Sequence, residues 1–144
     1  MAPFLISAAV VGVDQLIKRL VMDRFTPGES LPLIPSVLHL TYVQNRGAAF
    51  GLLQGQQLLF IGLALLVIGW LGRELIKTGT SRLVAWSAAL VLGGAAGNLL
   101  DRICLGYVVD FIDVRVWPVF NVGDSAITIG VALLLWQSVF PGHK

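Results

Sequence analysis

Two aspartates in the last third of the chain have the residue type and the surroundings that acid–base catalysis requires. Asp110 lies within the apolar run Tyr107–Ile112, and Asp124 directly precedes the last apolar segment. An ionised carboxylate in such surroundings is poorly solvated and is costly unless something uses it. If the two carboxyl groups meet, repulsion and low polarity leave one of them protonated, so the pair supplies an acid and a base together. Such a pair could activate a water molecule for attack on an amide carbonyl.

Each acidic residue of this region also has a structural interpretation. Residues 97–125 hold four of the eight acidic residues in a chain that is only 12% charged. Asp124 and Ser125 are good N-capping residues and could simply begin the last helix. Asp101 and Asp113 each have an arginine close by in the sequence, which favours a structural or interfacial ion pair for both.

The first apolar segment, residues 2–22, carries three charges toward its far end. It lacks the basic start and the cleavage site of a cleaved signal peptide, so we interpret it as a retained transmembrane helix. Lys18 and Arg19 have side chains long enough to reach the membrane interface, whereas Asp14 is short and lies one turn deeper. Asp14 could pair with Lys18 or help to shape a site, and the two roles are compatible.

The composition predicts an integral membrane protein. Of the 144 residues, 56% are hydrophobic, and the mean hydropathy is +0.84. A soluble domain of this length cannot bury so much apolar surface, so lipid must surround much of the chain. No repeat or linker divides the sequence, and we expect a single membrane-embedded domain over residues 1–144. The net charge of +2 comes from scattered basic residues, which excludes a clustered nucleic-acid-binding face.

Four apolar segments have roughly the length that crosses a bilayer: residues 2–22, 57–73, 83–101 and 124–140. The third contains the small residues 93–97, which let a neighbouring helix approach closely. Asn98 and Arg102 lie four residues apart, on one helical face at the end of this segment.

The polar region between the first two segments, residues 23–57, predicts an extramembrane loop with local β-structure. Val37–Val43 partly alternates between apolar and polar residues, which indicates a short strand. On residue types alone, the following Gln44–Gly51 is best interpreted as a turn that closes a hairpin, with Asn45 and Gly47 supplying positive φ.

Other hydrolytic chemistries lack their partners. A serine enzyme needs a base beside its nucleophile, and the two histidines, His39 and His143, lie in the first loop and at the opposite terminus. Cys104 has no histidine near it in the sequence. Two histidines and one cysteine cannot readily supply a metal site, although a carboxylate-only site is left open. We therefore expect neither a metal nor another cofactor.

Five short segments follow one another along nearly the whole chain. They are Asp14-Gln15-Leu16-Ile17-Lys18, Asn45-Arg46-Gly47-Ala48-Ala49-Phe50, Gly97-Asn98-Leu99-Leu100-Asp101-Arg102, Gly106-Tyr107-Val108-Val109-Asp110-Phe111-Ile112-Asp113 and Phe120-Asn121-Val122-Gly123-Asp124-Ser125-Ala126. In order and spacing these segments resemble the motifs of bacterial lipoprotein signal peptidase, also called signal peptidase II. Each segment alone is weak, whereas the ordered set is specific.

The resemblance implies an α-helical integral membrane protein of four transmembrane helices with a small extracytoplasmic β-cradle. It implies an aspartyl endopeptidase of the bacterial cytoplasmic (inner) membrane, with both termini cytoplasmic and the active site toward the outer leaflet. The implied substrates are prolipoproteins, which lose their signal peptide by cleavage before the diacylglyceryl-modified cysteine of the lipobox. Membrane lipids are further implied partners, and the cyclic peptide globomycin is an implied inhibitor. The orientation rests on the resemblance, because basic residues are too evenly spread for the positive-inside rule.

Carried over by position, the resemblance implies that Asp110 and Asp124 are the catalytic aspartates. The residues implied to bind substrate or to support the site are Asp14, Asn45, Asn98, Arg102 and Asn121. Two positions depart from the family pattern: Gly123 stands where alanine is usual, and Ile17 where a hydroxyl residue is common. Glycine could loosen the start of the last helix, but the loss of one methyl group should not abolish the chemistry.

Two interpretations from other classes also follow from the sequence. The chain could be a small proton-coupled carrier or channel subunit whose Asp14 and boundary aspartates relay protons. It could also be a non-catalytic assembly protein that uses the small-residue face for helix packing. A carrier should place more polar groups deep within several spans, and the second and fourth apolar segments hold no charge in their interiors.

Overall fold

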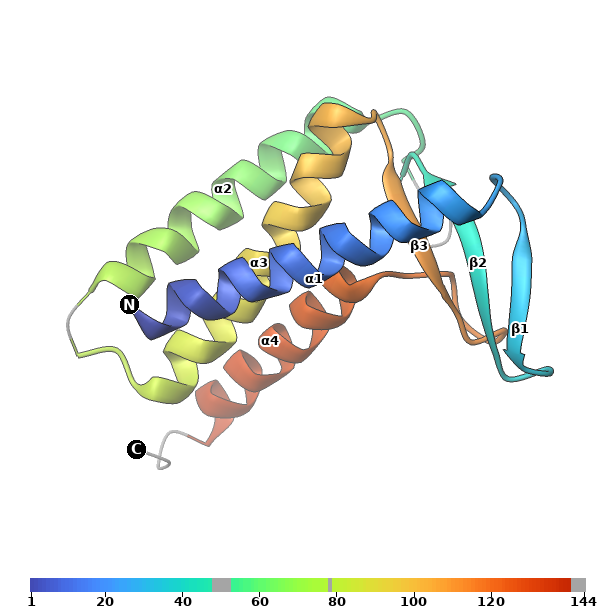
Figure 1. Cartoon of the computed structure of the whole chain (residues 1–144). Coiled ribbons are helices and arrows are strands. Elements are labelled where there is room, and N and C mark those ends of the chain that lie inside the picture. Colours follow the sequence, from blue (N-terminus) through green and yellow to red (C-terminus); the bar gives the residue numbers. More distant parts are fainter. Residues whose placement is uncertain (48–52, 78, 141–144) are drawn as a thin grey trace.

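The computed structural model describes residues 1–47, 53–77 and 79–140. Within these residues the chain forms a bundle of four helices with a small sheet at one end (Figure 1). The helices are α1 (Ala2–Arg24), α2 (Gln57–Ile76), α3 (Arg82–Cys104) and α4 (Val122–Val139), and the strands are β1 (Ser30–Ile34), β2 (Leu38–Asn45) and β3 (Val108–Asp113). Each predicted apolar segment coincides with one helix to within three residues at either end.

Three of the described helices, α2, α3 and α4, are long and apolar enough to cross a membrane. Every stretch of 18 residues within α1 includes Asp14, Lys18 and Arg19, so its composition alone is too polar for a span. The membrane span that the sequence assigns to α1 therefore stays a prediction.

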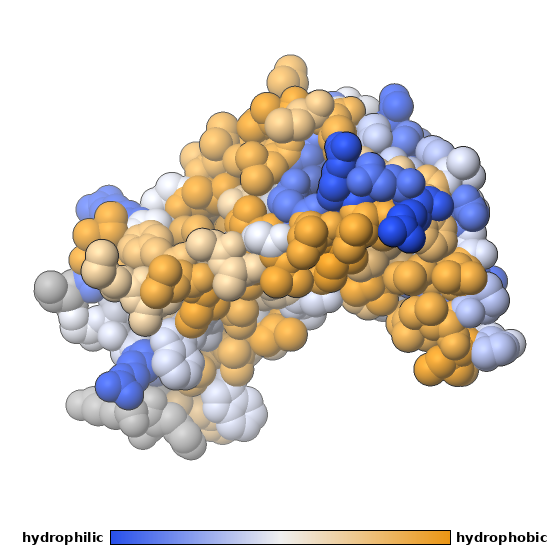
Figure 2. All heavy atoms as spheres, in the orientation of Figure 1, coloured by the Kyte–Doolittle hydropathy of each residue, from blue (hydrophilic) through white to orange (hydrophobic). Residues whose placement is uncertain are grey.

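The outer surface of the bundle is apolar. On α2 the side chains of Leu58, Leu66 and Trp70 are more than half exposed, and Leu71 is the helix's one buried residue. A helix that is apolar all round is suited to lipid rather than to water. Figure 2 shows hydrophobic residues over most of the visible face of the helices, with hydrophilic residues gathered toward the sheet end of the bundle.

α3 is the most buried helix, and its small residues bring its neighbours close. A Cβ atom added to Gly93 would lie 2.8 Å from the backbone oxygen of Ser7 in α1, and one added to Gly94 would collide with the backbone of Gly123 in α4. The approach on the α1 side is reinforced by the Ser7 hydroxyl, which donates to the Ala89 carbonyl at 2.8 Å. The predicted small-residue face over residues 93–97 is confirmed as a helix-packing surface.

The sheet is antiparallel, with the strand order β1-β2-β3. β2 covers the predicted strand, but the hairpin between β1 and β2 turns at Ser36, whose φ is 62°. Asn45 continues β2 and pairs with Val108, so the prediction that Asn45 and Gly47 close a hairpin with positive φ is wrong. Residues 48–51 of that predicted turn, and with them the end of the second family-like segment, lie outside the described residues.

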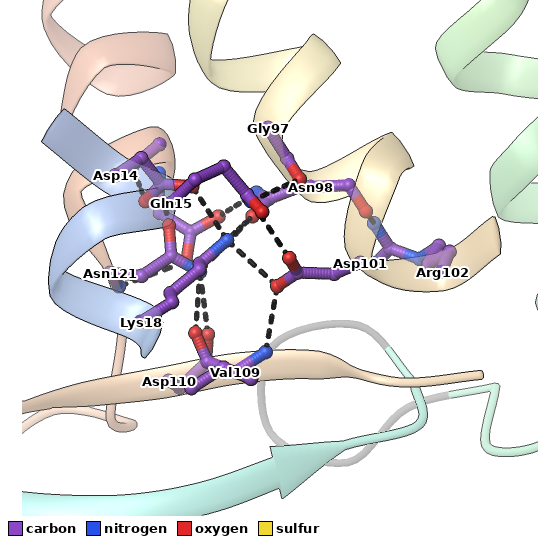
Figure 3. Close-up of polar contacts among 12 residues, drawn as sticks. Asp14, Gln15, Lys18, Gly97, Asn98, Asp101, Arg102, Val109, Asp110 and Asn121 are labelled. Atoms are coloured by element: carbon purple, nitrogen blue, oxygen red, sulfur yellow. Dashed lines mark hydrogen bonds and ion pairs between the residues drawn. The ribbon is translucent and has the colours of Figure 1, made fainter. Parts of the chain in front are cut away.

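β3 carries two different surfaces, because successive side chains of a strand point to opposite faces. Val109 and Phe111 are buried in a core with Val21 of α1 and Tyr42 of β2. Asp110, between them, projects from the other face toward the helices (Figure 3). Packing of the sheet against α1 therefore fixes the place of Asp110.

The close approach of α3 and α4 leads to a stability prediction. Gly94→Ala should lower the free energy of unfolding by about 1–3 kcal/mol, because the added methyl group has no room beside Gly123. Gly62→Ala is the matched control, since an added Cβ there meets nothing within 4 Å. Thermal unfolding in detergent measures both variants. Equal melting temperatures for the two would contradict the packing role of Gly94.

Candidate active site

The two aspartates singled out in the sequence line one cavity of about 310 Å³. Asp110 comes from β3 and Asp124 from the first turn of α4. Three of the residues expected to support the site, Asn45, Asn98 and Arg102, line the same cavity. The fold thus brings together residues that lie up to 79 positions apart in the sequence, from Asn45 to Asp124.

Asn121 lies between the two carboxyl groups and binds both. Its Nδ2 donates to Asp110 Oδ1 at 2.7 Å, and its Oδ1 accepts from the Asp124 backbone N–H at 2.8 Å. The Asn121 backbone N–H in turn donates to Asp124 Oδ2 at 3.2 Å. This reciprocal arrangement is a capping box, in which Asn121 is the N-cap and Asp124 the third helical residue. The prediction that Asp124 itself caps the last helix is therefore wrong.

The remaining oxygen of each carboxyl group accepts from another asparagine. Asn45 Nδ2 donates to Asp110 Oδ2 at 2.9 Å across the β2–β3 pair. Asn98 Nδ2 donates to Asp124 Oδ1 at 2.8 Å. Three asparagines therefore orient both carboxyl groups toward one cavity without neutralising them, because an amide supplies hydrogen bonds but no charge.

Burial raises the pKa of the Asp110 carboxyl, and the nearby charge of Asp124 raises it further, to about 7. The hydrogen bonds from Asn45 and Asn121 and the charge of Lys18 act in the opposite direction. Asp110 is only 1% exposed, so water cannot compensate for these effects. Asp110 can therefore gain or lose a proton near neutral pH.

The Lys18 side chain points into the protein, toward Asp14, Asn98 and Asp101 (Figure 3). Its side chain is 1% exposed, and its Nζ lies 2.7 Å from Asp14 Oδ2 and 2.9 Å from Asp101 Oδ2. The predicted pairing of Asp14 with Lys18 is confirmed, whereas the prediction that Lys18 reaches the interface is wrong. An ammonium between two carboxylates on neighbouring helices has no need of lipid headgroups or water.

Asp101 also differs from its predicted role. Its partner is Lys18 and not the adjacent Arg102, and it accepts from Gln15 Nε2 at 2.8 Å and from the Val109 backbone N–H at 3.0 Å. Asp101 therefore joins α1, α3 and β3 beneath the site. For Asp113 the prediction is confirmed, because Arg115 Nη1 lies 3.0 Å from its Oδ2.

Arg102 is a cation that faces the cavity itself. Its guanidinium lies over the ring of Phe60, with 5.0 Å between its Cζ and the ring centroid, and Nη1 donates to the Asn98 carbonyl at 3.4 Å. The contact with the ring helps to hold the guanidinium in the cavity wall. No pattern in the sequence predicts the contact of Phe60 with Arg102, because one aromatic residue among the apolar residues of α2 is not distinctive.

Asp14 supports the site from α1. Its Oδ1 accepts from the Gly123 backbone N–H at 2.8 Å, one residue before Asp124. A Cβ atom on Gly123 would lie 3.0 Å from the Gly94 carbonyl oxygen, so glycine here fits a tight contact. The expectation that glycine loosens the start of α4 stays a prediction. Ile17, the other departure from the family pattern, packs against the core formed by the sheet and α1.

Two apolar hollows adjoin Asp124. Asp124, Asn98 and Arg102 border a cavity of about 450 Å³ whose other walls are apolar side chains of α2, α3 and α4. A second hollow of about 390 Å³ lies between Asp124 and the aromatic residues Trp117 and Phe120. The polar centre therefore opens onto surfaces that suit an apolar substrate.

The other residues considered for chemistry lie elsewhere. His39 Nδ1 is 3.2 Å from the Ser30 hydroxyl in the β1–β2 hairpin, and Cys104 is exposed at the end of α3. Over residues 1–47, 53–77 and 79–140, no three or more His, Cys, Asp or Glu side chains form a group that could hold a metal ion. The expectation of a site without metal stays a prediction.

Comparison with known proteins gives one consistent result. The family model described as signal peptidase (SPase) II matches residues 6–140. The lipoprotein signal peptidase of Halothermothrix orenii is 51% identical over 137 residues, which cover 93% of this chain and 94% of that protein. The lipoprotein signal peptidase of Moorella thermoacetica is 50% identical over 144 residues, which cover 99% and 96%. The solved structure of a bacterial membrane enzyme matches this structure with a TM-score of 0.89 and 34% sequence identity. The match covers 99% of this chain and 93% of that enzyme's chain.

The raised pKa of Asp110 can be tested without any substrate. Asp124→Asn should lower the pKa of Asp110 below its value of about 7, because the charge of Asp124 is one of the two causes that raise it. Infrared spectra against pH follow the protonated carboxyl band, which Asp110→Asn identifies by its loss. Asp23→Asn is the control, since it removes the same charge from a side chain that is 51% exposed. A band that titrates near 4 in the unmodified protein would refute the raised pKa.

Proposed function

The chain belongs to the signal peptidase II family, and we propose that Asp110 and Asp124 are the catalytic pair of this peptidase. As a lipoprotein signal peptidase it is a hydrolase that removes signal peptides from prolipoproteins. The observation that carries the proposal is the shared cavity, in which three asparagines orient the two carboxyl groups toward the same space. We assign its aspartic chemistry to these two residues.

In the proposed reaction one carboxyl group is ionised and the other is protonated. The ionised group removes a proton from a water molecule as the water oxygen attacks the scissile carbonyl carbon. The protonated group donates its proton to the carbonyl oxygen, which gives a neutral tetrahedral intermediate. When the C–N bond breaks, the leaving nitrogen takes up the proton held by the pair, and one hydroxyl group of the intermediate returns its proton to the pair as the carboxylic acid product forms. The two carboxyl groups then again share one proton.

The asparagines and Arg102 have different roles in this proposal. Asn45, Asn98 and Asn121 hold the carboxyl groups and take no part in proton transfer. Arg102 lies in the wall of the cavity, where its planar group of N–H donors can bind a backbone carbonyl of the substrate. Its positive charge also stabilises the negative charge that the pair keeps throughout the reaction.

We propose that the apolar hollows beside Asp124 receive the apolar parts of the substrate. The family acts on prolipoproteins, and the proposed cleavage site precedes a cysteine that carries a diacylglyceryl group. A lipid-modified cysteine places the scissile bond at a fixed depth, so the membrane contributes to its positioning. The cavity of about 450 Å³ along α2, α3 and α4 provides an apolar lining at that bond. Globomycin, an apolar cyclic peptide, is proposed to bind at the same place.

We also propose that α1 is the fourth membrane span. Its charges Asp14 and Lys18 are buried inside the protein and paired with each other, so they do not face lipid. Its outward side chains include the exposed Leu5, Val13 and Leu16. With four spans both termini lie on one side, which we propose is the cytoplasm, and the sheet and the two aspartates lie toward the outer leaflet. The single domain over residues 1–144 is part of the same proposal.

The other function classes have less support. A proton-coupled carrier would use Asp14 and the boundary aspartates as a relay, but Asp14 is bound to Lys18 and the Gly123 N–H. A non-catalytic assembly protein would use the residue 93–97 face for partners, but that face is filled by α1 and α4. Family membership also favours neither class.

The substrate requirement is the first functional prediction. Purified protein in detergent should cleave a lipobox peptide that carries a diacylglyceryl-modified cysteine, and the unlipidated peptide should be cleaved far more slowly. Mass spectrometry of the products locates the cut, which is expected directly before the modified cysteine. Equal rates for the two peptides would show that the lipid has no part in recognition. No cleavage of either peptide would contradict the proposed function.

The second functional prediction concerns the pair itself. Asp110→Asn and Asp124→Asn should each lower kcat by at least ~100-fold, because each change removes a group that transfers a proton. The double variant should be hardly slower than either single variant, since residues that act as a unit do not contribute additively. Globomycin binding and folding should be affected much less than turnover. Asp113→Asn, on the same strand, is the control and should keep most activity.

Losses that multiply in the double variant would indicate that the two aspartates act independently. Substantial turnover in either single variant would remove that residue from the proposed pair. The pH dependence gives a further check, because a coupled pair should produce a bell-shaped rate profile.

A further inference from the structure

We propose that Lys18 is a positioning residue of the active site, which fixes the orientation of the Asn98 amide and sets the charge beneath the two catalytic aspartates. The proposal rests on the function proposed above, and it adds a residue that the sequence had assigned to the membrane interface. Lys18 touches neither aspartate of the pair through any described hydrogen bond or ion pair. It acts through Asn98 and through its electrostatic field.

The Lys18 ammonium has three close partners. Nζ donates to Asn98 Oδ1 at 2.8 Å and forms ion pairs with Asp14 Oδ2 at 2.7 Å and Asp101 Oδ2 at 2.9 Å. The Asp14 contact is within α1 and the other two are to α3, as Figure 3 shows. A side chain that is 1% exposed and has one hydrogen bond and two ion pairs is held in place from two helices.

This position determines which way the Asn98 amide faces. An ammonium can only donate, so the oxygen and not the nitrogen of the Asn98 amide has to face Lys18. The same oxygen accepts from Asn121 Nδ2 at 3.1 Å. The Asn98 nitrogen is thereby directed to Asp124 Oδ1, at 2.8 Å. A reversed amide would place an oxygen against the Asp124 carboxylate and would no longer donate to it.

Lys18 also sets the charge of the buried cluster. Asp14 and Asp101 carry two negative charges and Lys18 one positive charge, so the three together carry one negative charge beside the pair. Among the described residues that line the cavity, Arg102 from α3 is the charged group that faces the pair. Lys18 acts to lower the pKa of Asp110. Its loss should therefore move proton release from the active site to higher pH.

The test measures cleavage of the diacylglyceryl-modified lipobox peptide against pH. Lys18→Met keeps a long unbranched side chain, one atom shorter than lysine, and removes its charge and donors. It should lower kcat by at least ~10-fold with KM changed by less than ~3-fold, because the group acts on catalysis and not on substrate binding. The bell-shaped kcat profile should move up by about one pH unit, as expected for removal of one charge at close range from a coupled pair.

Three further variants separate charge from orientation. Arg19→Met removes one positive charge from the next residue of α1, at a side chain 72% exposed, and should leave the profile unchanged. Asp101→Asn removes one negative charge and should move the profile to lower pH. Asp14→Asn combined with Lys18→Met restores the cluster charge to minus one. This double variant should return the profile toward that of the unmodified protein while kcat stays low, since Asn98 still lacks the ammonium.

The possible outcomes are distinct. If Lys18→Met lowers only the melting temperature and the folded protein keeps its kcat and pH profile, Lys18 is purely structural and the proposal is wrong. If Lys18→Met fails to fold, the pH profiles of Asp101→Asn and of the double variant Asp14→Asn/Lys18→Met test the proposal instead. An unchanged pH profile in Asp101→Asn overturns the proposal. If the unmodified protein cleaves neither peptide, the function proposed above fails instead. The infrared titration of Asp110 in the same variants then still tests Lys18, with the band shifted up in Lys18→Met and down in Asp101→Asn.

Discussion

The site depends on one constraint: lipid and apolar helix faces offer no hydrogen-bond partners, so each polar group at the end of the bundle must be satisfied by the chain itself. The structure meets this constraint by alternating donors and acceptors. The Lys18 ammonium forms ion pairs with two carboxylates and donates to one amide oxygen, and the nitrogen of that amide donates to Asp124. Asn121 Nδ2 donates both to the same amide oxygen of Asn98 and to Asp110 Oδ1. A chain of neutral amides thus connects a buried charge to the reacting groups.

The small residues of α3 are needed for the same reason as the polar ones. Hydrogen bonds between helices require the backbones to approach, and a Cβ atom on Gly97 would lie 2.6 Å from Asp14 Oδ2. The contact of Gly94 with Gly123 similarly brings the start of α4 to Asn98. The hydrogen bonds between these helices therefore form only if the helices also pack closely. A bulkier residue at these positions would separate donors from acceptors that have no alternative partners.

The sequence predicts the helices and singles out the two aspartates that line one cavity, because both depend on local patterns. Apolar segments of membrane length mark the helices, and a carboxylate inside an apolar run marks a functional position. Partners between elements are not local. Adjacency in the sequence predicts an ion pair between Asp101 and Arg102. Adjacent residues of a helix, however, point in directions about 100° apart. The actual partner of Asp101 is Lys18, which lies on another helix. The residue types around Asn45 predict a turn, whereas the structure places Asn45 in β2. The pairing of β2 with β3 joins residues 63 positions apart, so no local pattern reveals it.

The N-cap of α4 is hard to predict from the sequence for a different reason, because both Asn121 and Asp124 are good capping residues. The structure uses both in one capping box, so the two carboxyl groups of the proposed pair lie in different surroundings. Asp124 lies in the first turn of a helix, where the free N–H groups stabilise negative charge, and it accepts from one of them, the Asn121 N–H. Asp110 lies on a strand, which has no comparable dipole, and burial raises its pKa to about 7. We infer that the shared proton resides on Asp110 before the reaction, so that Asp124 is the base that activates water and Asp110 the acid that protonates the carbonyl oxygen.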